Sequence, residues 1–221
     1  MKTIYGISGL GADERAFSRL EMEGYQFIFL PWLSPLPKET IKEYAVRMSQ
    51  GITTDNPILM GLSFGGMMCI EIAKLVPVEK VILISSIKSQ KELPRWLRMV
   101  AVLRLNKIFP LKSYKITEPI QNRFIGISEP DEIALVRSYR KNAPQVYMDW
   151  AVNQAITWRN DWLPPAIYHV HGDADRIFPI NYLVPTHIIR GGGHFMIMNK
   201  STEVNEALKE ILASGKNTSF C

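Results

Sequence analysis

The chain has 221 residues, of which 47% are hydrophobic and 21% charged, and its net charge is +5. This composition is typical of a globular protein with a sizeable core and excludes a disordered or fibrous chain. No apolar stretch is long enough to span a bilayer, and the N-terminus lacks the apolar region and cleavage site of a secretory signal. We therefore expect one domain with an insertion, a cytoplasmic location and no stable membrane insertion.

Basic residues are concentrated in the middle of the chain, where residues 88–141 contain twelve Lys or Arg and five Asp or Glu. Such a patch can attract nucleic acid or anionic lipid, but the sequence contains no recognisable nucleic-acid-binding module. We interpret it as a solvated basic face and expect no nucleic-acid partner. An alternative is association with a lipid surface through the basic amphipathic segment from Arg95 to Phe109.

Only two cysteines are present, Cys69 in a helical stretch and Cys221 at the end of a polar tail. Two isolated cysteines support neither a disulfide framework nor a metal cluster. We expect Cys69 to be a small core residue, and we predict no metal and no cofactor. No oligomeric state is predicted.

Short apolar runs rich in β-branched residues alternate with helical patterns, which is typical of a parallel sheet covered by helices on both faces. The predicted helices around this sheet span Lys38–Met48, Met67–Leu75 and Glu203–Ala213. Six strands are predicted, at Thr3–Ile7, Gln26–Leu30, Pro57–Met60, Lys80–Ser85, Ala166–His171 and Thr186–Arg190.

The alternation breaks after Ser85, and eighty residues precede the next strand. We predict three helices there, at Pro94–Phe109, at Glu129–Lys141 with Ser128 as its start, and at Pro144–Trp158. The first should expose Arg95, Arg98, Arg104 and Lys107 and bury Trp96, Met99, Val100, Leu103 and Phe109. We accordingly divide the chain into a core of residues 1–87 and 163–221 and an inserted helical cap of residues 88–162.

The segment Gly61-Leu62-Ser63-Phe64-Gly65 joins a predicted strand to a predicted helix. In a turn this tight the middle residue has a strained backbone, and only small residues two positions away avoid a clash. Gly61 and Gly65 meet that requirement and leave the hydroxyl of Ser63 exposed at a helix N-terminus. The pattern indicates a nucleophile elbow, and the alternative is an ordinary glycine-rich turn.

A serine hydroxyl is a poor nucleophile unless a base accepts its proton and a third group orients that base. His194 follows three glycines directly after the last predicted strand, at the end of the sheet where the elbow should also lie. We therefore predict His194 as the base, with His171 as the alternative. We expect His169 and His187 to be packed structural residues, because both lie within strands.

The acid should follow the strand before the histidine loop, where Asp173 and Asp175 both occur. The segment from His171 to Pro179 resembles the His-Gly-x-x-Asp-x-x-x-Pro pattern of the α/β-hydrolase superfamily, and the order Ser63, Asp175, His194 is that of the superfamily. The resemblance implies an α/β-hydrolase fold with Asp175 as the acid. Asp173 then caps a turn, and it remains the alternative acid.

A site for acyl transfer also needs backbone N–H groups directed at the developing oxyanion. One is expected from Phe64, directly after the nucleophile. The resemblance implies Leu10 as the second, because Ser8-Gly9-Leu10-Gly11 occupies the place where many relatives carry His-Gly-x-Gly. Here Ser8 replaces the histidine, and we expect it to brace the loop. The first two strands of the fullest family pattern are missing, which indicates a compact variant.

The resemblance implies a metal-independent serine hydrolase that acts on a small-molecule carboxylic ester, thioester or related acyl substrate through an acyl-enzyme. The same fold also supports carbon–carbon hydrolysis, hydroxynitrile cleavage and perhydrolysis, and a further alternative is a non-catalytic ligand-binding protein. Serine at position 63 argues against dehalogenase chemistry. Apolar cap residues are candidates to line the substrate pocket, although most are expected to pack the cap helices: Trp96, Met99, Met148, Trp150 and Trp158.

Overall fold

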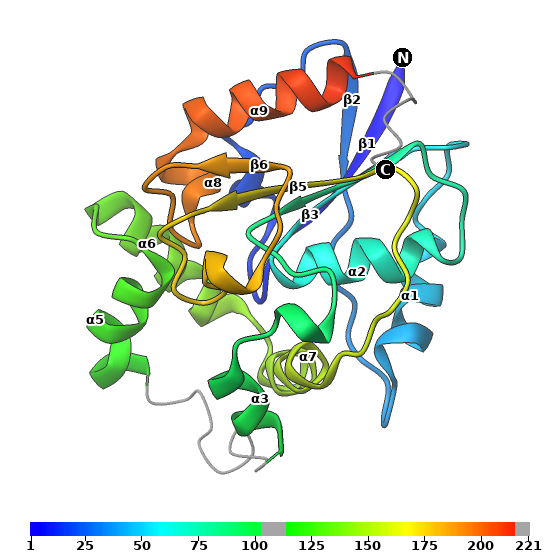
Figure 1. The fold of residues 1–221 in the computed structure, drawn as a ribbon. Coiled ribbons are helices and arrows are strands. Elements are labelled where there is room, and N and C mark those ends of the chain that lie inside the picture. The colour runs from blue at the N-terminus through cyan, green and yellow to red at the C-terminus, as the bar shows by residue number, and fades with distance from the viewer. Residues whose placement is uncertain (103–113, 215–221) are drawn as a thin grey trace.

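The strands form one parallel sheet in the order β2-β1-β3-β4-β5-β6 (Figure 1). The structure, a computed structural model, describes residues 1–102 and 114–214. Within these residues the sheet has six strands, which confirms the predicted α/β fold. Their bounds are β1 Lys2–Ile7, β2 Tyr25–Phe29, β3 Ile58–Leu62, β4 Lys80–Ile84, β5 Ile167–Gly172 and β6 His187–Ile189.

The strand β3 extends further than the sequence predicted. Gly61 pairs with Ile7 of β1, and Leu62 pairs with Ile84 of β4, so the first two residues of the glycine-rich turn belong to the strand. The nucleophile candidate Ser63 therefore follows directly after a strand end. Because β1 lies between β2 and β3, the sheet has its topological switch point beside Ser63, where open α/β sheets form their ligand crevices.

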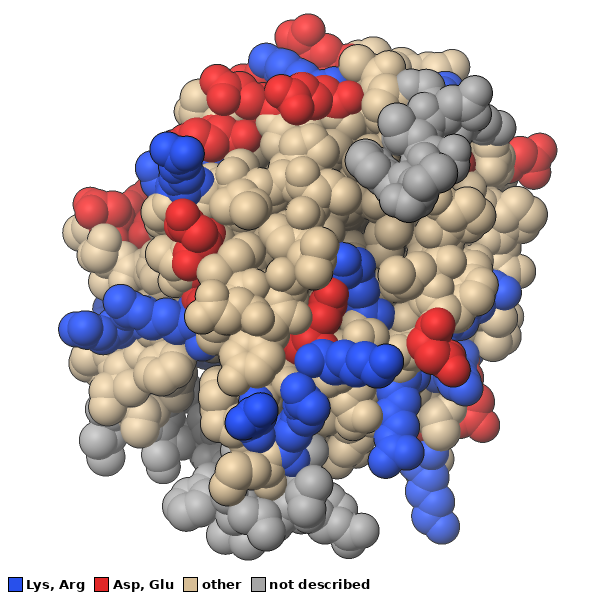
Figure 2. All heavy atoms as spheres, viewed as in Figure 1, with Lys and Arg blue, Asp and Glu red and all other residues tan. Residues whose placement is uncertain are grey.

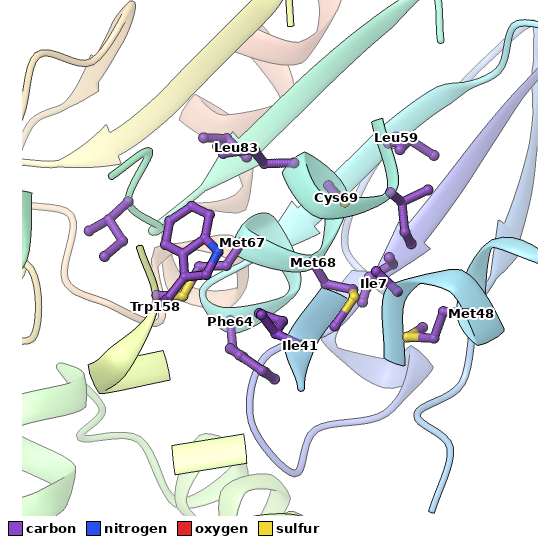
Figure 3. Packing of buried hydrophobic residues seen from close by; sticks show 14 of the residues in the cluster. Ile7, Ile41, Met48, Leu59, Phe64, Met67, Met68, Cys69, Leu83 and Trp158 are labelled. Carbon is purple, nitrogen blue, oxygen red and sulfur yellow. The ribbon is translucent and has the colours of Figure 1, made fainter. Parts of the chain in front are cut away.

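Helices α1 (Ile41–Ser49) and α2 (Phe64–Ala73) cover one face of the sheet. Figure 3 shows the side chains of Met67, Met68 and Cys69 of α2 packed among residues of the strands and of α1. Cys69 is fully buried, as expected for a core residue, and Cys221 lies outside the described residues. A capping box between Thr40 and Glu43 begins α1, three residues later than the Lys38 start predicted from the pattern.

The opposite face of the sheet packs against α8 (Met196–Asn199) and α9 (Ser201–Ala213). Ile4, Met60 and Ile82 point to this side, whereas the residues next to them in each strand point to α1 and α2. Both faces are therefore buried, which explains why the strands are continuous apolar runs without polar alternation.

Four described α-helices lie between β4 and β5. They are α3 (Arg95–Val102), α5 (Tyr114–Ile125), α6 (Pro130–Asn142) and α7 (Gln145–Thr157). Helix α5 was not predicted, because Pro119 lies within it and proline normally interrupts a helical pattern. The N-cap of α6 is Glu129 rather than Ser128, since Glu129 and Glu132 form the capping box.

The orientation predicted for α3 is only partly confirmed: Arg95 is exposed as expected, but the burial predicted for two apolar residues is wrong. Trp96 and Met99 are 45% and 61% exposed, although both were expected to be buried, and Leu97 packs against the core instead. The two arginines lie on one side of this short helix, but the pattern does not tell which neighbours cover the apolar side, and Trp96 lines a cavity and contacts Phe124. Arg98 is half-buried and donates to the carbonyl of Leu93 at 2.7 Å. The expectations for Leu103, Arg104, Lys107 and Phe109, and for the side chain of Val100, fall outside the described residues.

Lys and Arg side chains gather on the lower half of the face shown in Figure 2, over the part of the molecule that contains α3 and α7 in Figure 1. Asp and Glu gather more at the top, near α9, which carries Glu203, Glu206 and Glu210. On this face, basic side chains are therefore more numerous over the lower half than near the last helix.

Candidate active site

Ser63 lies between β3 and α2 with φ 52° and ψ −117°, a conformation that is strained for a residue with a side chain. A β-carbon at Gly61 would collide with the carbonyl of Gly65, and one at Gly65 would collide with the carbonyl of Ile7. Both glycines are therefore required by the backbone, as the elbow pattern predicted. The turn directs Ser63 into a cavity at the carboxyl ends of the strands.

A continuous hydrogen-bonded chain runs from Ser63 to Asp175. The Oγ of Ser63 lies 2.9 Å from Nε2 of His194, and Nδ1 of His194 lies 2.8 Å from Oδ2 of Asp175. An ionised carboxylate only accepts hydrogen bonds, so Nδ1 of His194 donates to it, and Nε2 is then free to accept the serine proton. The structure thus brings together the three residues that the sequence selected.

The carboxylate of Asp175 is only 3% exposed and is held from both sides. Its Oδ1 accepts hydrogen bonds from the backbone N–H groups of Ile177 at 2.8 Å and Phe178 at 3.0 Å. Burial by itself would raise the pKa of Asp175, but His194, His171 and these hydrogen bonds together keep the pKa below its usual value. Asp175 is therefore an ionised partner for His194.

The alternative acid, Asp173, does not contact His194. Its Oδ1 accepts a 2.7 Å hydrogen bond from the backbone N–H of Gly191, so it fixes the turn that leads into the histidine loop. The alternative base, His171, is completely buried on the other side of Asp175, with its Nε2 3.4 Å from Oδ2. Within the described residues, neither alternative lines the cavity at Ser63.

The other two histidines lie in the sheet, as predicted. His169 is 1% exposed in β5 and contacts His171. His187 in β6 contacts the hydroxyl of Thr186 at 2.9 Å and lies 3.6 Å from a carboxylate oxygen of Glu210.

The loop after β1 lies directly beside the elbow. A β-carbon on Gly9 would be 3.5 Å from the β-carbon of Ser63, and both Leu10 and Phe64 line the cavity. Ser8 braces this loop, because its hydroxyl donates to the carbonyl of Ala12 at 2.6 Å and accepts from Nε1 of Trp32 at 3.2 Å. The two expected oxyanion donors are thus on adjacent segments next to Ser63.

The cavity has a volume of about 740 Å³ and is bounded by the strand-end loops and by the inserted helices. Its wall is mostly apolar, with a few polar side chains, among them Gln121, Arg140 and Gln145. A cavity of this size accommodates a small organic ligand. Apolar residues that the sequence did not single out also line it: Leu97, Ile120, Phe124, Val152, Ala155 and Ile156.

Of the five predicted pocket residues, only Trp96 and Met148 line the cavity. Trp150 stacks on Tyr44 with ring centroids 4.3 Å apart, and its Nε1 donates to a backbone carbonyl. Trp158 is buried and donates to Glu71 at 2.8 Å, while Met99 is exposed at the surface. Trp150 and Trp158 therefore pack in the core, and Met99 lies at the surface. The sequence did not predict these positions, because the orientation of a helix depends on its tertiary contacts.

A model of the alpha/beta hydrolase family matches residues 16–207. The chain therefore belongs to the alpha/beta hydrolase family. A search of curated proteins finds no match.

Solved structures with the same fold include enzymes of different activities. A thermophilic esterase from Thermogutta terrifontis is 20% identical to this chain, with a TM-score of 0.68. The alignment covers 96% of this chain and 89% of the esterase chain. An esterase from Exiguobacterium antarcticum is 14% identical, with coverages of 97% and 92% and a TM-score of 0.75. A bromoperoxidase from Bacillus anthracis is 17% identical, with coverages of 96% and 92% and a TM-score of 0.68. At these identities the similarity establishes the fold.

The part of the chain that the structure describes contains no cluster of three or more His, Cys, Asp or Glu side chains arranged to hold a metal ion. Among its helices, none combines the length and the apolar character needed to cross a bilayer.

Proposed function

We propose that the protein is a serine hydrolase that cleaves a carboxylic ester, thioester or related acyl compound through an acyl-enzyme. The observation that carries this proposal is the hydrogen-bonded chain from Asp175 through His194 to Ser63, which ends in an apolar cavity. Membership of the alpha/beta hydrolase family supports it. No cofactor is required by this chemistry.

In the first half-reaction, Nε2 of His194 takes the proton of Ser63 while Oγ attacks the carbonyl carbon of the substrate. Asp175 stabilises the imidazolium that forms and keeps Nδ1 protonated. His194 then donates its proton to the leaving group, which leaves the acyl group esterified to Ser63. In the second half-reaction His194 activates a water molecule, whose attack releases the acid and restores the serine hydroxyl.

The oxyanion of each tetrahedral intermediate is assigned to the backbone N–H groups of Leu10 and Phe64. Phe64 is the first residue of α2, so its N–H lies at the positive end of the helix dipole. The brace that Ser8 provides keeps the Leu10 loop beside Ser63. Donors fixed in this way stabilise the charge that develops on the carbonyl oxygen.

The acyl group is assigned to the apolar part of the cavity, between α5, α6 and α7. Phe124, Val136 and Val152 come from these three helices and line the cavity with apolar surface. Burial of each methylene of an acyl chain contributes about 0.8 kcal/mol. Residues 88–162 thus act as the cap that selects the substrate, which favours acyl groups with an aliphatic chain.

The proposal is tested with a panel of p-nitrophenyl esters of increasing acyl-chain length, measured with the wild-type protein and Ser63→Ala. We expect turnover by the wild-type protein and its loss in the variant. No turnover of any ester at high enzyme concentration would favour the non-catalytic binding protein. Equal turnover by the variant would contradict the assignment of Ser63 as nucleophile.

A further inference from the structure

Two buried histidines, His169 and His171, have no part in the proposed reaction but lie next to its acid, Asp175. His169 and His171 are 1% and 0% exposed, and their two-residue spacing places them on the same face of β5. Nε2 of His169 is 3.2 Å from Nδ1 of His171. Nε2 of His171 is in turn 2.8 Å from the carbonyl oxygen of Phe178 and 3.4 Å from Oδ2 of Asp175.

The acceptors around this pair determine where its protons lie. A backbone carbonyl and an ionised carboxylate only accept hydrogen bonds, so Nε2 of His171 must carry the proton that is shared between them. In a neutral His171 the other ring nitrogen, Nδ1, is then an acceptor, and it receives the Nε2 proton of His169. Burial favours the neutral form of both rings and lowers the pKa of both, most strongly that of His169.

Phe178 connects this pair to the acid through its backbone. Its N–H donates to Oδ1 of Asp175 at 3.0 Å, and its carbonyl accepts from Nε2 of His171 at 2.8 Å. The ring of Phe178 also contacts His194, with centroids 5.4 Å apart and an interplanar angle of 70°. A shift of this residue would therefore displace a hydrogen-bond donor of Asp175 and the ring that flanks the base.

We propose that His171, held in its Nε2–H form by the carbonyl of Phe178 and the carboxylate of Asp175, is a positioning residue that fixes Asp175 for its hydrogen bond to His194. It acts in two ways, by anchoring the carbonyl of Phe178 and by placing its own N–H beside Oδ2 of Asp175. The catalytic consequence rests on the proposed serine-hydrolase function, whereas the structural consequence does not. The pair extends the line Ser63–His194–Asp175 into the interior of the sheet.

The main test compares His171→Phe, which removes the donor but keeps an aromatic ring, with His171→Gln, which keeps an N–H donor. Loss of an orienting partner of this kind costs about ten- to a hundredfold in activity, and we expect a loss of that size in kcat for His171→Phe with little change in KM. His171→Gln should recover most of the activity. His187→Gln, a histidine change on the neighbouring strand, should behave as the wild type.

A second measurement uses the wild-type protein and remains informative if a variant does not fold. Long-range 1H–15N NMR correlations of the histidine rings report which nitrogen carries the proton. We expect a neutral His171 with its proton on Nε2 and a neutral His169 with its proton on Nε2 at neutral pH. A proton on Nδ1 of a neutral His171 would overturn the proposal.

The outcomes separate this proposal from the proposed function. The Nδ1 proton of His194, bonded to Asp175, should give a far-downfield NMR signal in the wild type that is lost or shifted in His171→Phe and kept in His187→Gln. Persistence of that signal in folded His171→Phe, or wild-type kcat in that variant while Ser63→Ala is inactive, would overturn the positioning role alone. Activity that survives in Ser63→Ala would overturn the proposed function, and the NMR signal would still test the positioning role.

Discussion

Gly65 lies so close to the backbone of Ile7 that no β-carbon fits at position 65. The contact joins the first turn of α2 to the end of β1, the strand that leads into the Gly9–Leu10 loop. It therefore bears on the spacing between Ser63 and the loop that carries Leu10, one of the two expected oxyanion donors. The glycine is required by the approach of two backbone segments, which cannot be relieved by moving a side chain.

Gly65→Ala should therefore destabilise the protein strongly, by about 3 kcal/mol or more, because the new methyl group overlaps backbone atoms. Gly24→Ala is the control for a glycine without a close contact: Gly24 has a left-handed backbone, with φ 79°, and no atom lies within 4 Å of its added β-carbon. That change should cost only about 1 kcal/mol. Urea unfolding of both variants measures the difference, and equal losses would contradict the role of the contact.

The two aspartates after β5 give a matched pair of substitutions. Asp175→Asn places an amide opposite Nδ1 of His194 and favours the wrong tautomer, so kcat should fall by about 10⁴-fold. Asp173→Asn keeps an oxygen that can accept from Gly191, so kcat should change little. Steady-state kinetics on one ester distinguish the two, and the reverse order of losses would assign the acid to Asp173.

The sheet and the proximity of the proposed triad residues Ser63, Asp175 and His194 could be predicted from the sequence, because the patterns that indicate them are local. Strands buried on both faces are continuous apolar runs, and the elbow requires glycines at fixed positions around Ser63. The loops after parallel strands meet at one edge of the sheet, so His194 and an acid after β5 could be paired with Ser63 before any distance was known. The resemblance to the family pattern then selected Asp175 over Asp173.

The inserted helices could not be predicted to the same extent. Helix α5 was not predicted because it contains Pro119. The inner face of α3 depends on tertiary contacts that residue spacing does not encode, so Trp96 and Met99 were expected to be buried but are exposed. The link from His171 to Asp175 was also missed. The two-residue spacing of His169 and His171 in a strand places both on one face. Because β5 ends just before Asp175, this spacing could have indicated that the two histidines lie near the acid.

The proposed acyl pocket predicts a change in chain-length preference. Val152→Trp on α7 adds bulk to the cavity wall, while Val146→Trp on the same helix replaces a side chain that is 71% exposed. If two or three methylenes lose their site at about 0.8 kcal/mol each, kcat/KM for a long ester should fall more than tenfold relative to acetate. The ester panel measures this ratio, which should stay at the wild-type value in Val146→Trp. A lowered ratio in both variants would contradict the pocket.

Stability should fall as the pH drops from about 7 to about 5. In the folded protein, burial lowers the pKa of His169 and His171 below the ordinary value of 6.5. Below the pKa that these histidines have in the unfolded chain, the unfolded chain binds more protons than the folded protein. The stability that the two neutral rings contribute is therefore fully present above this pH and is lost as the pH falls toward their pKa values in the folded state. The pKa of Asp175 is lowered from 3.8, so its contribution is lost only at more acidic pH.

Urea unfolding at several pH values measures this slope. His169→Gln should make it shallower by up to about 1.4 kcal/mol per pH unit, the limit for one proton. His187→Gln is the control and should retain the wild-type slope. An unchanged slope in His169→Gln would contradict burial of this residue as a neutral ring.

The most direct test of the central claim is labelling with a fluorophosphonate probe, followed by intact-mass measurement and mapping of the modified peptide. The account predicts one phosphonyl group per molecule, attached to Ser63, and no labelling of Ser63→Ala. Labelling of His194→Ala should be much slower, because the serine loses its base. Labelling that persists in Ser63→Ala, or that maps to another residue in the wild type, would contradict the assignment of Ser63 as the nucleophile.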